Sequence, residues 1–315
     1  MGFESILGNE RLKDNLTNSL GRGRISHFYV ISGPAGSGKQ TLARLMAAAI
    51  LCRDAHRPCG RCGPCRKALE DTHPDVITVQ DPEHKTTAVK IIRQYREDVF
   101  IRPNEADHKI YIFPQEMGIE GQNALLKILE EPPSYGVFIL LTENPEKLLP
   151  TIRSRCTQLP MQALPGRTLK AALAREFPKA SAEDLEAAAF RSGGWLGQAK
   201  TILEEGSALP PQTEDFVRSF SARDALGLTQ LLAPMEKLKR DQLMEILANW
   251  TELLEQALAC RAGLSAVSAP AKTLSAARTS QELMAAVRSL KKALTYAQGN
   301  ISPAAICGWL SWELR

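Results

Sequence analysis

Short apolar stretches alternate with helical patterns over about the first 160 residues of the chain. Four of these stretches are rich in β-branched and aromatic residues, at positions 28–32, 75–79, 109–113 and 136–142. Stretches of this length, separated by helices, are typical of strands in a parallel sheet that helices cover on its faces. We therefore expect residues 1–161 to form an α/β domain.

The pattern becomes helical between residues 162 and 207. Ser181 and Asp184 have the spacing of a helix N-cap and its capping-box partner. The Pro-Pro pair at 210–211 favours an extended linker, because proline cannot continue a helix and holds the residue before it extended. The sequence thus predicts a small helical domain at 162–207, a boundary near residue 208 and a third domain at 208–315.

Two apolar stripes run through the third region. Their members recur every three or four residues, as on one face of a helix, and are Leu243, Ile246, Leu247, Trp250, Leu253, Leu254 and Leu258 in the first, and Leu283, Val287, Leu290 and Leu294 in the second. Such stripes predict the internal core of an all-α domain, an interpretation that we prefer to a bare groove for a partner. The stretch at 262–277 is rich in Ala and Ser, and we expect a loose connection there.

The composition is that of an ordinary globular protein. At 315 residues the chain is long enough for two or three domains, and 44% hydrophobic with 23% charged residues argues against disorder. No apolar run is long enough to cross a bilayer, and the N-terminus lacks the regions of a signal peptide. We expect a cytoplasmic protein with no membrane partner. The net charge of +4 permits contact with nucleic acid but does not indicate it.

A strand, a glycine-rich turn and a helical segment follow one another at positions 28–50, which is the context of a phosphate-binding loop. The residues that we expect to face a polyphosphate are Gly33, Gly36, Gly38, Lys39 and Thr41. The glycines let backbone N–H groups turn toward phosphate oxygens, and the lysine and the helix N-terminus supply positive charge. The sequence therefore favours a cradle for a polyphosphate, and whether ATP or ADP binds there stays open.

This loop departs from the usual pattern at one position. Gln40 stands where the pattern has Ser or Thr, whose hydroxyl group would bind Mg²⁺. Thr41 comes one residue late, which on a helix is a rotation of about 100°. Two interpretations stay open: a relic loop that binds no nucleotide, and a loop that binds nucleotide weakly.

A P-loop enzyme that hydrolyses ATP also needs acidic residues at the end of a later strand. The candidate strand at 109–113 runs into Pro114, Gln115 and Glu116. The metal-binding Asp is missing at the strand end, and we do not expect Glu116 to replace it, because a proline changes the local path of the chain. These two losses predict a chain that does not hydrolyse ATP in its own site.

Four segments carry a resemblance to a known family. They are residues 6–10, 26–34, 123–133 and 149–156, which include Asn-Ala-Leu-Leu-Lys and Ser-Arg-Cys. The chain resembles the clamp-loader subunits of bacterial DNA polymerase III, in the AAA+ superfamily. The resemblance implies a RecA-like P-loop domain, a helical lid, a C-terminal collar that joins a ring, and a role in DNA replication. It also implies gamma/tau- and delta-type subunits, the sliding clamp and primed DNA as partners, and no polymerase chemistry in this chain.

Subunits of that family differ in their nucleotide sites. Gamma- and tau-type motors keep both nucleotide-site motifs, whereas the delta-prime subunit has a similar fold and a degenerate site. Gln40 and the Pro114-Gln115 segment favour the delta-prime type, and an active gamma/tau-type motor is the alternative. The second sensor arginine of the family would fall near Gly197, where this chain has no arginine.

The same resemblance implies a role for Arg155, which lies in the Ser-Arg-Cys segment. In the family this arginine acts as a finger that reaches the ATP of an adjacent subunit. A planar and permanently charged guanidinium suits the spread charge of a transferring phosphoryl group. The alternative is a surface arginine that closes a helix.

Four of the seven cysteines are clustered, and they are Cys52, Cys59, Cys62 and Cys65. Glycines and prolines between them allow tight turns, so that four sulfurs can surround one Zn²⁺ in a closed, structural site. An iron–sulfur cluster and disulfides are the alternatives, and we rank both below zinc. A nucleic-acid-binding zinc module on an inactive scaffold is a third hypothesis for function. We expect His56 and His73 to be ordinary loop residues.

Overall fold

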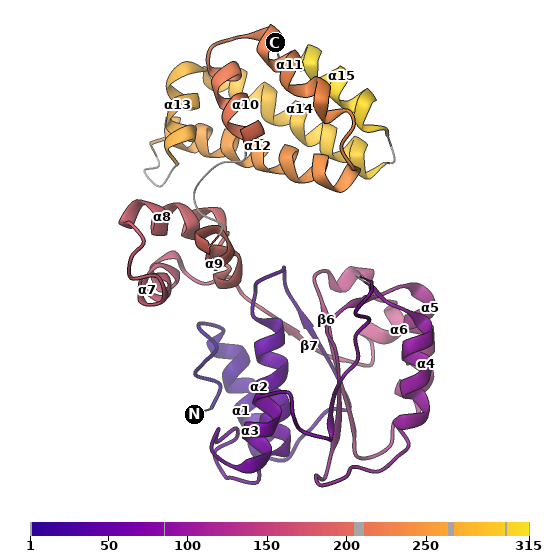
Figure 1. Ribbon diagram of the computed structural model, residues 1–315. Helices are drawn as coiled ribbons and strands as arrows, with labels where there is room; N and C mark the ends of the chain where they lie inside the picture. Colours follow the sequence, from indigo (N-terminus) through magenta and orange to yellow (C-terminus); the bar gives the residue numbers. More distant parts are fainter. Residues whose placement is uncertain (1, 85, 205–210, 264–267, 300, 315) are drawn as a thin grey trace. The chain divides into compact units, whose positions relative to one another are not determined.

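The computed structural model describes residues 2–84, 86–204, 211–263, 268–299 and 301–314 (Figure 1). Contacts divide the chain into two compact units. The first is Met1–Leu173 with Gly194–Gln198, and the second is Ala174–Gly193 with Ala199–Arg315. The predicted boundary near residue 208 lies outside the described residues, and the division into three domains stays a prediction.

A parallel sheet of five strands forms the centre of the first unit, in the order β2-β4-β6-β1-β7. Its strands are β1 (Phe28–Ser32), β2 (Val76–Thr78), β4 (Lys109–Phe113), β6 (Gly136–Thr142) and β7 (Thr157–Pro160). The first four confirm the four predicted strands. The edge strand β7 was not predicted, since three of its four residues are exposed and it has no apolar run. Two short strands, β3 (Thr86–Thr87) and β5 (Glu116–Met117), form a separate pair.

Helices cover both faces of this sheet, as Figure 1 shows. On one face lie α1 (Glu10–Gly21), α2 (Lys39–Leu51) and α3 (Gly63–Leu69); on the other lie α4 (Val89–Asp98), α5 (Ile119–Glu130) and α6 (Pro150–Arg153). Alternate residues of β1 enter the two cores, with Tyr29 and Ile31 on the α2 side and Phe28 and Val30 on the α5 side. Because both faces are buried, the strands have continuous apolar runs. The predicted α/β fold with a parallel sheet is confirmed.

Three helices follow the sheet: α7 (Gly166–Glu176), α8 (Ala182–Arg191) and α9 (Leu196–Glu204). Ser181 caps α8, because its Oγ accepts a hydrogen bond from the backbone N–H of Asp184 at 3.0 Å. The predicted N-cap at this position is therefore confirmed.

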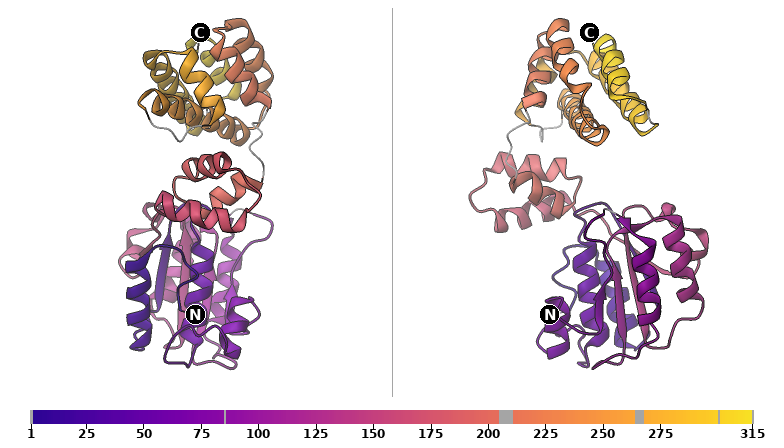
Figure 2. Two further views of the ribbon diagram at one scale, coloured as in Figure 1. Left: turned by 90° about the vertical axis from the view of Figure 1, so that its left-hand side faces the viewer. Right: turned by 45° about the vertical axis from the view of Figure 1, so that its right-hand side comes forward.

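The remaining helices pack around a core of their own (Figure 2). They are α10 (Pro211–Ser221), α11 (Ala225–Met235), α12 (Arg240–Arg261), α13 (Ala269–Ala277), α14 (Ser280–Gln298) and α15 (Pro303–Glu313). Trp250 of α12 is fully buried and stacks on Phe216 of α10, with ring centroids 4.2 Å apart. Most residues of both predicted stripes are buried, so the stripes form an internal core and not a bare groove.

The expectation of a loose connection at 262–277 was wrong for its second half, where α13 forms. A proline in its first turn suits helix initiation, because proline fixes φ and needs no hydrogen-bond acceptor there. Ala271 and Leu274 are fully buried, and this packing outweighs the weak sequence pattern. Among the described helices, none combines the length and the apolar character needed to cross a membrane.

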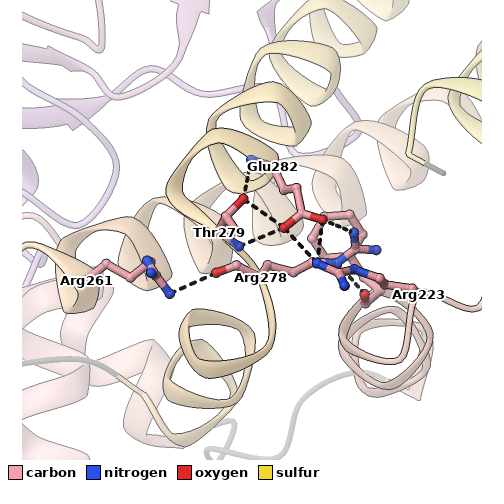
Figure 3. A network of polar contacts seen from close by, with 6 residues as sticks. Arg223, Arg261, Arg278, Thr279 and Glu282 are labelled. Atoms are coloured by element: carbon pink, nitrogen blue, oxygen red, sulfur yellow. Dashed lines mark hydrogen bonds and ion pairs between the residues drawn. The ribbon is translucent and has the colours of Figure 1, made fainter.

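A polar network holds the first turn of α14 to the end of α10 (Figure 3). The Glu282 carboxylate accepts hydrogen bonds from the backbone N–H and the Oγ1 of Thr279, each at 2.8 Å. It also forms ion pairs with Arg223 at 2.8 Å and with Arg278 at 2.9 Å. Arg278 is only 5% exposed, and its Nε donates to the Phe220 carbonyl oxygen at 2.8 Å. Glu282 therefore joins three segments of the second unit.

Candidate functional site

The predicted phosphate loop connects β1 to α2 and is closed on its own lysine. The Nζ of Lys39 donates hydrogen bonds to the carbonyl oxygens of Gly33 and of Pro34, the latter at 2.8 Å. Partial burial lowers the pKa of Lys39, and the charges of Glu143 and Glu116 oppose that effect. The ammonium group that would meet a phosphate thus donates to backbone carbonyl oxygens of the loop itself.

The segment that starts α9 lies directly against this loop. The backbone N–H of Gly197 donates to the Gly36 carbonyl oxygen at 2.9 Å, and Nε2 of Gln198 donates to the Ala35 carbonyl oxygen at 2.9 Å. A Cβ at Gly197 would lie 2.6 Å from the Cα of Gly36, which is closer than two non-bonded carbon atoms approach. Only glycine therefore fits at position 197, near which the family resemblance would place an arginine.

Gln40 and Thr41 are both exposed in the first turn of α2, whereas Leu42 and Ala43 are fully buried. Gln40 therefore offers an amide at the position where the usual pattern has a hydroxyl group to hold Mg²⁺. Thr41 lies one position further along the helix.

Gln115, which follows the end of β4, has a structural role. Its Oε1 accepts from the backbone N–H of Asp81 at 2.7 Å, and its Nε2 donates to the carbonyl oxygens of Asp81 at 2.9 Å and of His84 at 2.8 Å. These bonds use the amide to hold the loop after β2. A neutral amide in this role cannot take a proton from water as a carboxylate does, so it is no substitute for a catalytic base.

Glu116 points toward the end of β6. Its Oε1 accepts from Thr142 Oγ1 at 3.1 Å and from the backbone N–H of Glu143 at 3.2 Å, and Lys147 lies 3.6 Å from its carboxylate. Burial lowers the pKa of Lys39, and the negative charge of Glu116 is near enough to oppose that effect in part. The structure thus brings the Glu116 carboxylate close to the phosphate loop, although the residue at the end of the strand, Pro114, is not acidic.

Arg155 lies on the other layer of the first unit. It follows α6, whose buried Ile152 packs with β6 and α5, whereas the phosphate loop leads into α2 on the opposite face. The side chain is exposed, and its Nη1 donates to the Thr151 carbonyl oxygen at 3.0 Å. Arg153, in contrast, forms an ion pair with Glu146. The structure therefore does not gather Arg155 with the phosphate-loop residues.

The four clustered cysteines converge at the end of α2 and the start of α3. All four sulfurs lie within 4.8 Å of one another, and the Cys59–Cys65 and Cys52–Cys62 pairs are each 4.0 Å apart. A tetrahedron with metal–sulfur bonds of about 2.3 Å has sulfurs about 3.8 Å apart. The donor set and its spacing therefore fit one Zn²⁺, which the four residues would hold without an open position.

Backbone groups around the cluster favour thiolates. The N–H groups of Arg61 and Cys62 point to the Cys59 sulfur and lower the pKa of that thiol to about 6. Burial raises the pKa of Cys65, whose sulfur packs 3.5 Å from the Ala48 carbonyl oxygen. The predicted metal ligands thus form a site that is anchored in the core beside α2.

The two histidines near the cluster have different surroundings. His56 is exposed, and His73 is 3% exposed with Nδ1 accepting from the backbone N–H of Asp75 at 3.1 Å. Burial lowers the pKa of His73. This hydrogen bond gives His73 a role in the turn before β2.

Comparisons with known proteins agree on one family. Residues 8–165 match the family described as DNA polymerase III, delta subunit. The chain is 38% identical over 192 residues to a DNA polymerase III subunit delta' from Pseudomonas aeruginosa, which covers 59% of this chain and 58% of that protein. It is 37% identical over 177 residues to a subunit gamma/tau from Mycobacterium tuberculosis, which covers 55% of this chain and 31% of that protein.

One match to a solved structure extends over almost the whole length of the chain. A gamma subunit-related protein from Thermotoga maritima matches 96% of this chain and 99% of its own, with 19% identity and a TM-score of 0.43. The chain spans between about a third and just over half of the length of the two curated relatives named above.

Proposed function

We propose that this chain, which belongs to the family described as DNA polymerase III, delta subunit, is a clamp-loader subunit of the delta-prime type. In this role it works in the cytoplasm in a ring with gamma/tau- and delta-type subunits, and the complex opens a sliding clamp and places it at primed DNA. The chain itself carries out no polymerase chemistry.

The observation that carries this proposal is the state of the phosphate loop. Lys39 bonds to its own loop, and Gly197 lies against Gly36, so the cradle is closed by the chain itself. Gln40 offers an amide in place of the hydroxyl group that would hold Mg²⁺, and Pro114 has no carboxylate. Hydrolysis of ATP in this chain's own site is therefore not expected, and weak nucleotide binding would first require this contact to open.

The contribution to catalysis comes from Arg155, which acts on the ATP of a neighbouring subunit. Its guanidinium is exposed and permanently charged, and the carbonyl oxygen of Thr151 braces it. A guanidinium placed on a transferring phosphoryl group can raise the rate by about 10³ to 10⁵. The exposed position suits a residue that works across a subunit boundary.

The four cysteines hold a structural zinc ion. Bound zinc would cross-link residues 52–65 to the core beside α2, because Cys52 and Cys65 are buried there and the loop between them is poor in apolar side chains. The closed four-sulfur set leaves no position for a substrate.

The alternative is an active gamma/tau-type motor, which Glu116 favours because its carboxylate lies close to Lys39. The test compares the purified chain with a loader reconstituted from its partners. We expect the isolated chain to show no Mg²⁺-dependent ATPase activity. Turnover by the isolated chain at the rate of a motor subunit would support the alternative.

In the reconstituted loader, Arg155→Ala should lower clamp-dependent ATP turnover by about 10³ and leave assembly intact. Arg153→Ala is the matched control, since Arg153 is paired with Glu146 and should change the rate by about twofold or less. Unchanged turnover with Arg155→Ala would remove the arginine from the mechanism.

A further inference from the structure

A cavity of about 620 Å³ lies beside the cysteine cluster, and the proposed function does not use it. The end of α2, the start of α3, the turn before β2 and the loop between α4 and β4 all contribute to its wall. Cavities that bind small molecules span about 300–1,000 Å³ and are mostly apolar. The size of this cavity is within that range, and its apolar lining consists of Ile25, Ile50, Leu51, Pro64 and Ala106.

One polar group of this lining is buried, the imidazole of His73, whose side chain is 1% exposed. Its Nδ1 accepts from the backbone N–H of Asp75, so the neutral ring carries its proton on Nε2. Burial lowers the pKa of His73, which keeps the ring neutral at pH 7. The Glu105 carboxylate is 3.8 Å from Nε2, beyond hydrogen-bonding distance. Among the described residues, this buried N–H therefore has no acceptor.

Asp75 fixes two sides of the cavity. Its carboxylate is fully buried and accepts from the backbone N–H groups of Asn104 at 2.6 Å, Glu105 at 2.9 Å and Ala106 at 3.0 Å. These bonds hold the loop wall, while the backbone N–H of Asp75 orients His73. Because one residue holds both, the polar lining is in place before a ligand arrives, which lowers the entropic cost of binding.

The carboxylates of the lining are paired, whereas one guanidinium is not. Arg57 donates from Nε to the Asp54 carbonyl oxygen at 3.2 Å, and no carboxylate of the described part of the chain lies within 4.0 Å of its guanidinium. Arg57 and His73 are thus two donors that can still take an acceptor. The paired carboxylates form the ion pairs Lys67–Glu105 at 2.6 Å, Arg53–Asp107 at 3.7 Å and Arg61–Asp54 at 3.4 Å.

The charges around the cavity are balanced. Residues 53–67 carry five basic side chains, against these three carboxylates and a zinc site whose four thiolates and one Zn²⁺ would have a net charge of about −2. Recognition therefore depends on direct hydrogen bonds and not on a long-range field. Guanidinium and imidazole N–H groups form their strongest hydrogen bonds with a carboxylate, which can accept from both.

We propose that this cavity binds a carboxylate on a short apolar body. Arg57 and the Nε2 of His73 hold the carboxylate, and the body packs on Leu51 and Ala106. A free carboxylic acid and the C-terminal residue of a polypeptide share this chemistry. Neither the phosphate loop nor Arg155 lines the cavity, so the inference does not rest on the proposed function.

The first test titrates the purified, zinc-containing chain with 4-methylpentanoate by isothermal titration calorimetry. We expect one site with a Kd on the order of 1 mM or below. The amide of the same shape, 4-methylpentanamide, should bind at least about tenfold more weakly, because it offers no charged acceptor. Absence of saturable binding, or equal affinities for the acid and the amide, would overturn the inference.

Arg57→Met removes the guanidinium and keeps an unbranched apolar side chain. We expect the Kd for 4-methylpentanoate to rise at least about tenfold and the zinc content to stay unchanged, since Arg57 contributes no sulfur to the cluster. Arg66→Met is the matched control, because Arg66 is exposed on α3 and does not line the cavity. The same Kd for Arg57→Met and wild type would contradict the inference.

His73 can be followed without a substitution, which covers the case in which Arg57→Met does not fold. A long-range ¹H–¹⁵N spectrum records the nitrogens of each imidazole. On addition of 4-methylpentanoate we expect the Nε2 resonance of His73 to shift. His56 is the internal control, because it is exposed and outside this lining. A His73 resonance that stays in place at saturating ligand speaks against the inference.

A pentapeptide that ends in leucine separates the two sources of the carboxylate. A Kd at least about tenfold below that of 4-methylpentanoate, lost when the peptide ends in an amide, supports the inference with a polypeptide C-terminus as the ligand. A peptide that binds no more tightly than 4-methylpentanoate supports it with a free carboxylic acid as the ligand. If neither the peptide nor the free acid binds, the inference is wrong.

Discussion

At the scale of single residues, the decisive feature is a contact between two glycines. Gly36 and Gly197 are more than 160 residues apart in the sequence and lie within van der Waals distance in the first unit. Their approach closes the phosphate loop, and the loop carbonyl groups hold Lys39. The two backbones can come this close because glycine has no side chain at either position.

A prediction follows for Gly197→Ala. The new Cβ would lie 2.6 Å from the Cα of Gly36 and 2.7 Å from its carbonyl oxygen, so backbone has to move. We expect the free energy of unfolding to fall by about 1–3 kcal/mol, as for an overpacked contact. Chemical denaturation followed by circular dichroism measures it.

Gly166→Ala is the control for that change. Gly166 is the first residue of α7, and a Cβ there meets nothing within 4 Å. We expect its free energy of unfolding to stay within about 0.5 kcal/mol of wild type. Equal effects of the two substitutions would mean that the contact between Gly36 and Gly197 is not tight.

At the scale of helices and strands, the sequence predicted the elements whose apolar residues form a regular pattern and missed the elements that have no such pattern. The four predicted strands are apolar on both faces and were found, whereas β7 has no apolar run, because three of its residues are exposed. The helix α13 was missed because Ala and Ser give no stripe, although Leu274 is fully buried. The spacing of apolar residues along the sequence predicted a helix or strand only where the buried residues recur at that spacing.

Residues of the candidate site follow the same rule. The spacing of the four cysteines was enough to predict that their sulfurs come together, since tight turns bring residues that are near in the sequence close in space. The role of Gln115 could not be predicted, because its partners Asp81 and His84 lie more than 30 residues away and hydrogen bonds of this kind leave no pattern.

The network at the start of α14 gives a prediction for pH. Hydrogen bonds from the backbone and the side chain of Thr279, with Arg278 and Arg223, lower the pKa of Glu282 to about 2 from its ordinary value of 4.5. A carboxyl group whose pKa is lower in the folded state stabilises that state above the unfolded value. This contribution should be complete above pH 4.5 and disappear as the pH falls toward 2.

Glu282→Gln tests this by thermal melting at several pH values. We expect the melting temperature of the second unit to be lower than in wild type at pH 7, and the difference to shrink between pH 4.5 and pH 2. Glu245→Gln, at an exposed position of α12, should show no such pH-dependent difference. A constant difference down to pH 2 would mean that the Glu282 charge does not act in this way.

At the scale of the whole molecule, the chain consists of two compact units with separate cores. The apolar clusters on the two faces of the sheet belong to the first unit, and the cluster of α10 to α15 belongs to the second. Units with separate cores can unfold in separate transitions. A perturbation of one unit therefore identifies its own transition.

Zinc removal is such a perturbation, because all four cysteines lie in the first unit. We expect about one equivalent of zinc in the purified chain. A chelator should lower the melting temperature of the first unit, because an ion that binds the folded state stabilises it, and leave that of the second unit unchanged. Glu282→Gln marks the second transition independently. A chelator that shifts both transitions equally, or neither, would contradict a zinc ion that stabilises the first unit alone.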